Sequence, residues 1–147
     1  MLSKKTKYGL KALIYIAKKS GYVPVLISEI SENEKIPKKF LEAILLDLKK
    51  YGILGSKMGK GGGYYLMKDP KTVTVATLIR VLDGPIAMLP CVSLNFYERC
   101  DDCPDQEVCS LNRFMIEVRD NTLNLLQHKS LHDLTGLDIN PPIMPLS

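Results

Sequence analysis

The chain has 147 residues, of which 46% are hydrophobic and 24% are charged. This balance supports a folded core and argues against a disordered chain, and the length suits one compact domain with an appended arm. No apolar run approaches the roughly 18 residues that a membrane span needs. Because the first residues are charged and contain no apolar signal core, we expect a cytoplasmic protein that makes no membrane contact.

Charge is distributed unevenly between the two halves of the chain. Residues 1–70 contain 14 basic against 6 acidic residues, a balance of +8, whereas residues 71–147 contain 6 against 10, a balance of −4. The net charge of +4 therefore hides a strongly basic N-terminal half. Such asymmetry favours a polyanionic partner, and a solvated lysine-rich surface is the alternative on charge alone.

The N-terminal half has the apolar spacing of three successive helices. Recurring apolar residues predict the first over residues 4–19, and a second is expected over 29–35 with Ser28 as its N-cap. A third is expected over 37–51, with Pro37 in its first turn. Its apolar stripe is formed by Leu41, Ile44, Leu45 and Leu48. The second and third helices, joined by a tight turn, are typical of a helix-turn-helix.

Two β-prone runs follow, over residues 53–58 and 64–67, and the glycine-rich segment 59–63 lies between them. This pattern predicts a hairpin, and a hairpin directly after a helix-turn-helix is a wing. The glycine-rich segment is not a Walker motif, because no Gly-Lys-Ser/Thr follows at the right spacing and the segment does not open a helix. We interpret it as the tip of the wing.

The second half contains three further helical patterns. We expect a helix over 73–82 capped by Thr72 or Thr74, a long amphipathic helix over 111–128, and a short last helix over 130–134. One side of the long helix carries Leu111, Met115, Val118, Thr122, Leu125 and Leu126. Because so short a chain offers this stripe too few partners, we expect the long helix to form a homodimer.

Together these elements predict a mainly α fold with a small β wing. The expected organisation is a winged helix-turn-helix DNA-binding domain over residues 1–84, a cysteine-rich sensor loop over 85–110, a dimerisation helix and a short final helix over 111–136, and a flexible tail over 137–147. No arrangement suggests a catalytic nucleophile, since His128 and His132 lie far along the chain from the cysteines. We therefore do not expect an enzyme.

Candidate DNA-binding residues lie on the third helix and the wing. Lys38 and Lys39 occupy the first helical turn, where cations oppose the helix dipole at a cost of about 0.3–1 kcal/mol each. That cost is understandable if this end of the helix faces DNA. Glu42 could accept a hydrogen bond from a cytosine amino group, and a solvated ion pair with Lys38 is the alternative.

The wing is expected to approach phosphate or the minor groove, because its glycines allow close backbone contact and its lysines add charge. A hairpin turn that makes no contact is the alternative. The candidate residues are Lys57, Lys60, Gly61 and Gly62.

All four cysteines lie in one short segment with the spacing Cys91-x8-Cys100-x2-Cys103-x5-Cys109. In a reducing compartment this clustering indicates metal ligands or a redox site rather than structural disulfides. Because thiolates favour soft metals, we predict an iron–sulfur cluster, with zinc as the second choice. The surrounding acids argue against a nucleophilic cysteine. Unliganded thiols or a disulfide are the alternative.

Three segments resemble one known family: YGLKAL at residues 8–13, IPKKFLEAILL at 36–46 and KGGGYYL at 60–66. They are similar to the bacterial Rrf2 family of winged-helix repressors, the IscR-like iron–sulfur regulators. The resemblance implies a homodimer that binds an operator in double-stranded DNA. It also implies an iron–sulfur cluster held by three cysteines and a variable fourth ligand. For the type of cluster we favour [2Fe–2S] over [4Fe–4S].

The cysteine pattern both follows this family and departs from it. Cys91, Cys103 and Cys109 match the family cysteines, although the segment between the first two is longer than in the best-known members. Asn112 stands where some members have a histidine, and Lys7 stands where others take a ligand from the first helix. Cys100 is additional, and we expect it to be the fourth ligand.

We therefore expect a DNA-binding transcriptional repressor that senses iron–sulfur or redox status through a cysteine-ligated cluster. The alternative is a cluster-free winged-helix regulator controlled by a partner protein or by thiol oxidation. A small iron–sulfur electron carrier is a third class, but it gives no reason for a basic helix-turn-helix and wing.

Overall fold

The computed structural model describes residues 2–19 and 22–136, and this part of the chain is mainly helical with a two-stranded antiparallel sheet. The elements in order are α1 (Lys4–Lys18), α2 (Ile27–Glu34), α3 (Lys38–Lys50), β1 (Leu54–Lys57), β2 (Gly63–Leu66), α4 (Val75–Leu82), the 3-10 helix η1 (Pro90–Val92), α5 (Ser110–Gln127) and α6 (Leu131–Leu134). This architecture confirms the predicted fold class. The tail predicted over residues 137–147 lies outside the described residues.

The core is formed by apolar side chains of α1 to α4 that have almost no exposed surface. It includes Leu13, Ile16, Ile30, Leu41, Ile44, Leu45, Leu48 and Leu78. Burying each such side chain stabilises the fold by about 1.5–3 kcal/mol. At Gly9 of α1 an added Cβ would lie 2.7 Å from Cδ1 of Leu82, so α1 and α4 approach closely because this position has no side chain.

The turn between α2 and α3 is tight, as the sequence predicts. Lys35 adopts the left-handed conformation with φ at 53° and is the C-cap of α2. Lys11 of α1 supports the turn, because its Nζ donates to the Glu34 carbonyl at 2.8 Å and pairs with the Glu34 carboxylate at 3.6 Å. One of the unpaired carbonyls at the end of α2 is thereby satisfied.

Helix starts differ from expectation by one or two residues. α2 begins before Ser28, with Leu26 as its N-cap and no capping side chain, so the prediction of Ser28 as N-cap is wrong. Pro37 is the N-cap of α3 rather than its first helical residue. Thr74 caps α4, since its side chain accepts a backbone hydrogen bond in the first turn.

The predicted wing hairpin is present, with β1 and β2 in a register that pairs Lys57 with Gly63. Val25, just before α2, adds an antiparallel bridge to Tyr64, and the two residues exchange backbone hydrogen bonds of 2.8 and 2.9 Å. An added Cβ at Gly63 would overlap the Val25 carbonyl, and the φ of Gly63 is 138°. Glycine is therefore required where these backbones meet.

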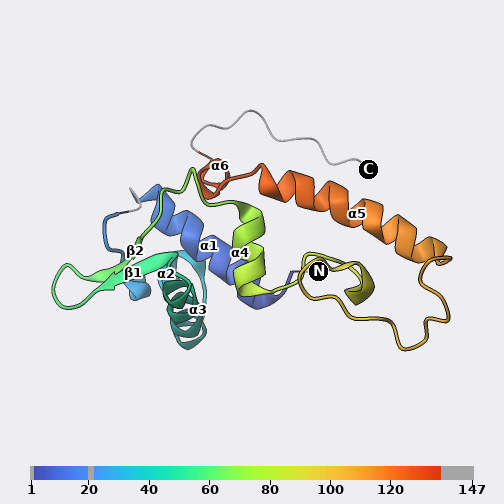
Figure 1. Ribbon diagram of the computed structural model, residues 1–147. Coiled ribbons are helices and arrows are strands. Elements are labelled where there is room, and N and C mark those ends of the chain that lie inside the picture. The colour runs from blue at the N-terminus through green and yellow to red at the C-terminus, as the bar shows by residue number, and fades with distance from the viewer. Residues whose placement is uncertain (1, 20–21, 137–147) are drawn as a thin grey trace.

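α5 extends away from the body formed by α1 to α4, and Figure 1 shows its N-terminal end near the segment that follows α4, far from the wing. Its other end is anchored through α6. Ser130 and Asp133 form a capping box there, and Leu131 is fully buried and donates its N–H to the Val73 carbonyl at 2.8 Å. No helix in the described ranges is long and apolar enough to span a bilayer.

Candidate DNA-binding surface and cysteine site

The first two turns of α3 present the predicted base-reading residues to solvent. Lys38, Lys39 and Glu42 are exposed, and the first turn contains neither an acidic residue nor a capping side chain. Among the described residues, none of the three forms an ion pair. The alternative pairing of Lys38 with Glu42 is therefore absent, and all three side chains are available to a partner.

Glu42 lies near the wing strand β2. Burial raises the pKa of Tyr64 on that strand, and the negative charge of Glu42 raises it further. Phe40 packs edge-on against Tyr8 of α1, with ring centroids 5.5 Å apart and planes at 81°. The ring contact orients the start of α3 relative to α1.

Other lysines hold α3 in place instead of facing solvent freely. Lys49 Nζ donates to Oγ of Ser56 at 2.7 Å and so joins the end of α3 to β1. Lys5 of α1 forms an ion pair with Asp47 at 2.9 Å, and its hydrogen bond keeps the pKa of that carboxyl below the ordinary value. Part of the basic excess in the N-terminal half is therefore used within the fold.

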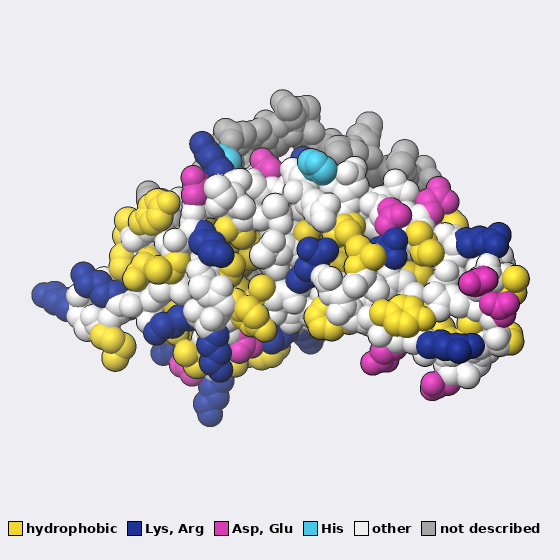
Figure 2. Space-filling model, in the orientation of Figure 1, with side chains coloured by type: hydrophobic (Ala, Val, Ile, Leu, Met, Phe, Trp, Pro, Cys, Tyr) yellow, Lys and Arg dark blue, Asp and Glu magenta, His cyan; other side chains and the backbone are white. Residues whose placement is uncertain are grey.

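The wing tip exposes two of its predicted contact residues, Lys57 and Lys60, with Met58 between them 90% exposed. Gly61 is exposed with φ at 74°, whereas Gly62 is buried and an added Cβ there would overlap the Lys57 carbonyl. Gly62 therefore shapes the turn, and DNA contact by either glycine stays a prediction. Figure 2 shows basic side chains at the wing tip and over the lower end of α3.

All four cysteines are free thiols that line one cavity of about 480 Å³. Cys91 is buried in η1, Cys109 is the N-cap of α5, and Cys100 and Cys103 lie on the loop between them. The structure thus brings the predicted ligands to one place, beside the N-terminal end of α5. That end of a helix favours negative charge.

Asn112 connects the two ends of the cysteine segment. Its Nδ2 donates to Sγ of Cys91 at 3.4 Å, and its backbone N–H donates to Sγ of Cys109 at 3.4 Å. The side chain is inaccessible, because only 5% of the residue is exposed. In the sequence, the one signal that marks Asn112 is its position three residues after Cys109.

The donor set fits a thiolate-bound metal group in its chemistry, but its thiols are not gathered in a coordination geometry. Within the described part of the chain, no three His, Cys, Asp or Glu side chains are arranged to hold a metal ion. A hydrogen bond with Cys91 raises the pKa of the Cys100 thiol, and burial and the charge of Asp102 act in the same direction. A cationic metal in the cavity would reverse this effect.

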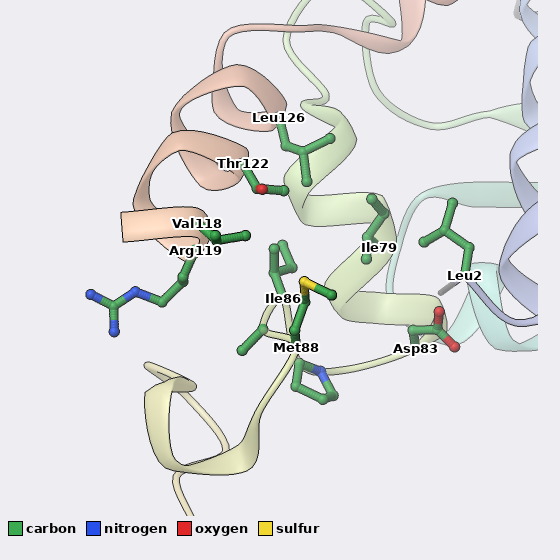
Figure 3. A pocket seen from close by; sticks show the side chains of 11 residues that line it. Leu2, Ile79, Asp83, Ile86, Met88, Val118, Arg119, Thr122 and Leu126 are labelled. Atoms are coloured by element: carbon green, nitrogen blue, oxygen red, sulfur yellow. The ribbon is translucent and has the colours of Figure 1, made fainter. Parts of the chain in front are cut away.

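Five of the six residues predicted for the dimer stripe fall into two sets, and the sixth, Met115, is half-buried. Val118, Thr122 and Leu126 line a cavity of about 240 Å³ between α5, α4 and the loop after α4, as Figure 3 shows. Leu111 and Leu125 are instead 53% and 59% exposed. The second set leaves apolar surface on α5 without a partner among the described residues.

Residues 2–136 match the Rrf2 family, which is described as an iron-dependent transcriptional regulator. The chain belongs to the Rrf2 family. This confirms the resemblance carried by the helix-turn-helix and wing segments. Over 137 residues the chain is 42% identical to an rrf2-like HTH-type transcriptional regulator of Rhodobacter capsulatus, covering 91% of each chain. It is 31% identical over 135 residues to IscR of Escherichia coli, covering 92% of this chain and 80% of that one.

Solved Rrf2-type structures have the same fold. CymR, the global cysteine regulator of Bacillus subtilis, superposes with a TM-score of 0.76 at 29% identity, covering 95% of this chain and 98% of that one. IscR of T. potens superposes with a TM-score of 0.71 at 26% identity, covering 91% and 85%. This Rrf2 protein is therefore a transcriptional regulator with a winged-helix fold.

Proposed function

We propose that this Rrf2 protein is a homodimeric repressor that binds operator DNA and holds an iron–sulfur cluster through Cys91, Cys100, Cys103 and Cys109. The observation that carries the proposal is that these four thiols line one cavity at the N-terminal end of α5. [2Fe–2S] is favoured over [4Fe–4S], and zinc in a four-thiolate site is the minor alternative. Such a regulator acts on DNA in the cytoplasm and is not an enzyme.

DNA binding is assigned to the exposed end of α3 and to the wing. In helix-turn-helix proteins the N-terminal residues of the second helix contact base edges, and here Lys38, Lys39 and Glu42 are exposed at that end. Lys57 and Lys60 stand on the wing, where they can neutralise phosphates without reading sequence. Glu42 is the candidate for reading a base, because a carboxylate can accept from cytosine but repels phosphate.

The cysteine site is linked to the DNA-binding surface through packed helices. Cys109 caps α5, α5 contacts α4, and α4 contacts both α1 and α3. A bound cluster would supply the iron- and redox-dependent chemistry at the start of this path. A rearrangement of the segment over 91–109 would thereby reach α3 through side chains already in contact.

The homodimer is supported by the apolar surface that α5 leaves exposed, above all at Leu111 and Leu125. Two subunits would place two recognition helices on one duplex. Half-sites about one helical turn apart then match the two-fold symmetry of the protein.

A cluster-free regulator is the second candidate, and two observations favour it. All four cysteines are free thiols that line one cavity, with Cys91 near enough to Cys100 to raise the pKa of its thiol, and the chain is 29% identical to CymR of B. subtilis over 135 residues. In that case oxidation of neighbouring thiols or a partner protein would replace the cluster as the signal.

Selection of duplexes from a random library, done anaerobically, tests the proposal. We expect one palindromic site to be enriched, and its affinity to change after the iron is removed with ferricyanide and a chelator. If affinity responds instead to peroxide and recovers with dithiothreitol in protein that never contained iron, the second candidate is correct. Enrichment of no site contradicts both.

A further inference from the structure

The short helix η1, which carries Cys91, is held against α5 by two side chains of that helix. Asn112 Nδ2 donates to Sγ of Cys91 at 3.4 Å, and Arg119 Nη1 donates to the carbonyl of Val92 at 2.7 Å. Residues seven apart lie on the same face of a helix, two turns from each other. One face of α5 thus contacts both the thiol and the adjoining backbone of η1.

The Arg119 contact fixes the backbone on which Cys91 stands. Its side chain is only 14% exposed and is steadied by an ion pair with Asp120 at 2.8 Å. Arg119 and Val118 both line the cavity drawn in Figure 3, and the guanidinium end of Arg119 is turned away from Val118. A charged donor on a carbonyl makes one of the stronger hydrogen bonds in proteins. The position of η1 relative to α5 is therefore set by a polar contact.

The Asn112 contact acts on the sulfur itself. An amide NH₂ is a donor, and the sulfur of Cys91 is the acceptor. Both residues are buried, Asn112 at 5% and Cys91 at 8% exposure, so water does not compete readily for either group. Both also line the cavity shared by the other three thiols. The amide is thus placed to orient this sulfur in the cavity.

We propose that Asn112 is a positioning residue of the cysteine site, which orients Cys91 by an N–H···S hydrogen bond while Arg119 holds η1. This inference rests on the proposed function where it concerns a cluster, but the contact with the thiol does not require one. Hydrogen bonds to ligand sulfurs stabilise the more negatively charged, reduced state of an iron–sulfur cluster and so raise its potential. Asn112 therefore regulates the redox response of the site.

Two variants remove the side-chain donor and leave unchanged the backbone N–H of Asn112, which donates to the capping sulfur of Cys109. Asn112→Leu preserves the branched shape of the side chain, and Asn112→Ser preserves polarity but is too short to reach Cys91. Asn121→Leu is the matched control, because Asn121 lies on the same helix, is exposed and donates only to the Glu117 carbonyl at 2.9 Å. Circular dichroism of each variant establishes that it is folded, and either Asn112 variant alone is sufficient for the test.

The first readout is an anaerobic redox titration followed by visible absorbance. We expect both Asn112 variants to retain colour with a midpoint potential more negative than that of wild type, and Asn121→Leu to keep the wild-type value. A purely structural role would lower the amount of cluster without moving the potential. An unchanged potential in folded, coloured Asn112 variants overturns the proposal.

The second readout uses protein without metal, so that it separates this inference from the proposed function. Alkylation by iodoacetamide, measured for each cysteine by mass spectrometry, should differ several-fold from wild type at Cys91 in the Asn112 variants, relative to Cys103 in the same molecule. Asn121→Leu should keep the wild-type ratio. If wild type holds no cluster but this ratio changes, the cluster assignment fails and the role of Asn112 stands. An unchanged ratio shows that Asn112 does not position Cys91.

Discussion

Ser3 and Asp83 are joined by two hydrogen bonds although 80 residues separate them: Ser3 Oγ donates to Oδ1 at 2.6 Å, and its backbone N–H donates to Oδ2 at 3.2 Å. The contact connects the N-cap of α1 to the C-cap of α4. Burial alone raises the pKa of Asp83, but the hydrogen bonds from Ser3 outweigh it, and the pKa lies below the ordinary value.

This carboxylate should therefore stabilise the fold in its charged form. A folded-state pKa below the unfolded value of about 4 gives stability that is present above pH 4 and is lost as the pH falls through the folded value. Asp83→Asn should lower the free energy of unfolding at pH 7 by less than about 1 kcal/mol, because the carboxylate is largely exposed. Urea unfolding at pH 7 and pH 2 checks this. Equal losses at both pH values would show that the charge is not the cause.

Local patterns in the sequence are sufficient to predict α3 and the wing hairpin beside it. Apolar spacing places α3 within a residue of its observed bounds because Leu41 and Leu48 recur at the helical period, and glycines locate the wing turn. The start of α2 is missed because no side chain caps it. The point where the chain enters α2 is fixed instead by the bridge from Val25 to Tyr64, which depends on a strand far along the chain.

The sequence predicts which cysteines form the site, but not the surrounding structure. Their clustering is visible in the sequence, but η1 is not, because three residues are too short for periodicity. Asn112 is overlooked for a related reason, since its partner Cys91 lies 21 residues away and the contact is tertiary. The stripe expected on α5 includes neither of its two buried residues, Asn112 and Leu123, because both lie about a quarter of a turn around the helix from that stripe.

Lys60→Ala should weaken binding to every duplex to the same extent, because a phosphate contact carries no base information. If the dimer neutralises about six phosphates, the slope of log affinity against log salt is near −5, and the variant should reduce its magnitude by about 1 per subunit. Titrations at several salt concentrations measure this slope. Lys129→Ala, an exposed lysine beyond α5, is the control. A variant with the wild-type slope would remove Lys60 from the interface.

Glu42→Ala should change which sequences bind. The expected effect is about 1–3 kcal/mol at one base position, because a carboxylate that accepts from cytosine discriminates among bases. Affinities for a set of single-base operator variants provide the measurement. Glu32→Ala, on the exposed side of α2, is the matched control. Equal loss on all duplexes would contradict a reading role.

Leu125→Glu should give monomers with weak operator affinity, because two half-sites require both subunits. The side chain is 59% exposed in the single chain, so the charge should not disturb the fold. Leu94→Glu is a close control, since Leu94 is also 59% exposed but lies off α5. Sedimentation of both variants decides the matter, and a Leu125→Glu protein that stays dimeric refutes the assignment of α5.

Replacing each cysteine by alanine tests which of them are cluster ligands. Cys91→Ala, Cys103→Ala and Cys109→Ala should each lose the brown colour, because each removes a ligand from a cluster that needs about four. Cys100→Ala should also bleach the protein if Cys100 is the fourth ligand. A coloured Cys100→Ala protein with a shifted spectrum would instead assign that place to a carboxylate such as Asp102, which lines the same cavity.

The most direct measurement is the iron and acid-labile sulfide content of wild-type protein purified without oxygen. A cluster held by the four thiols predicts brown protein with iron and sulfide in equal amounts. Wild-type protein that contains neither after anaerobic reconstitution would contradict the account, and the four thiols would then act without a cluster.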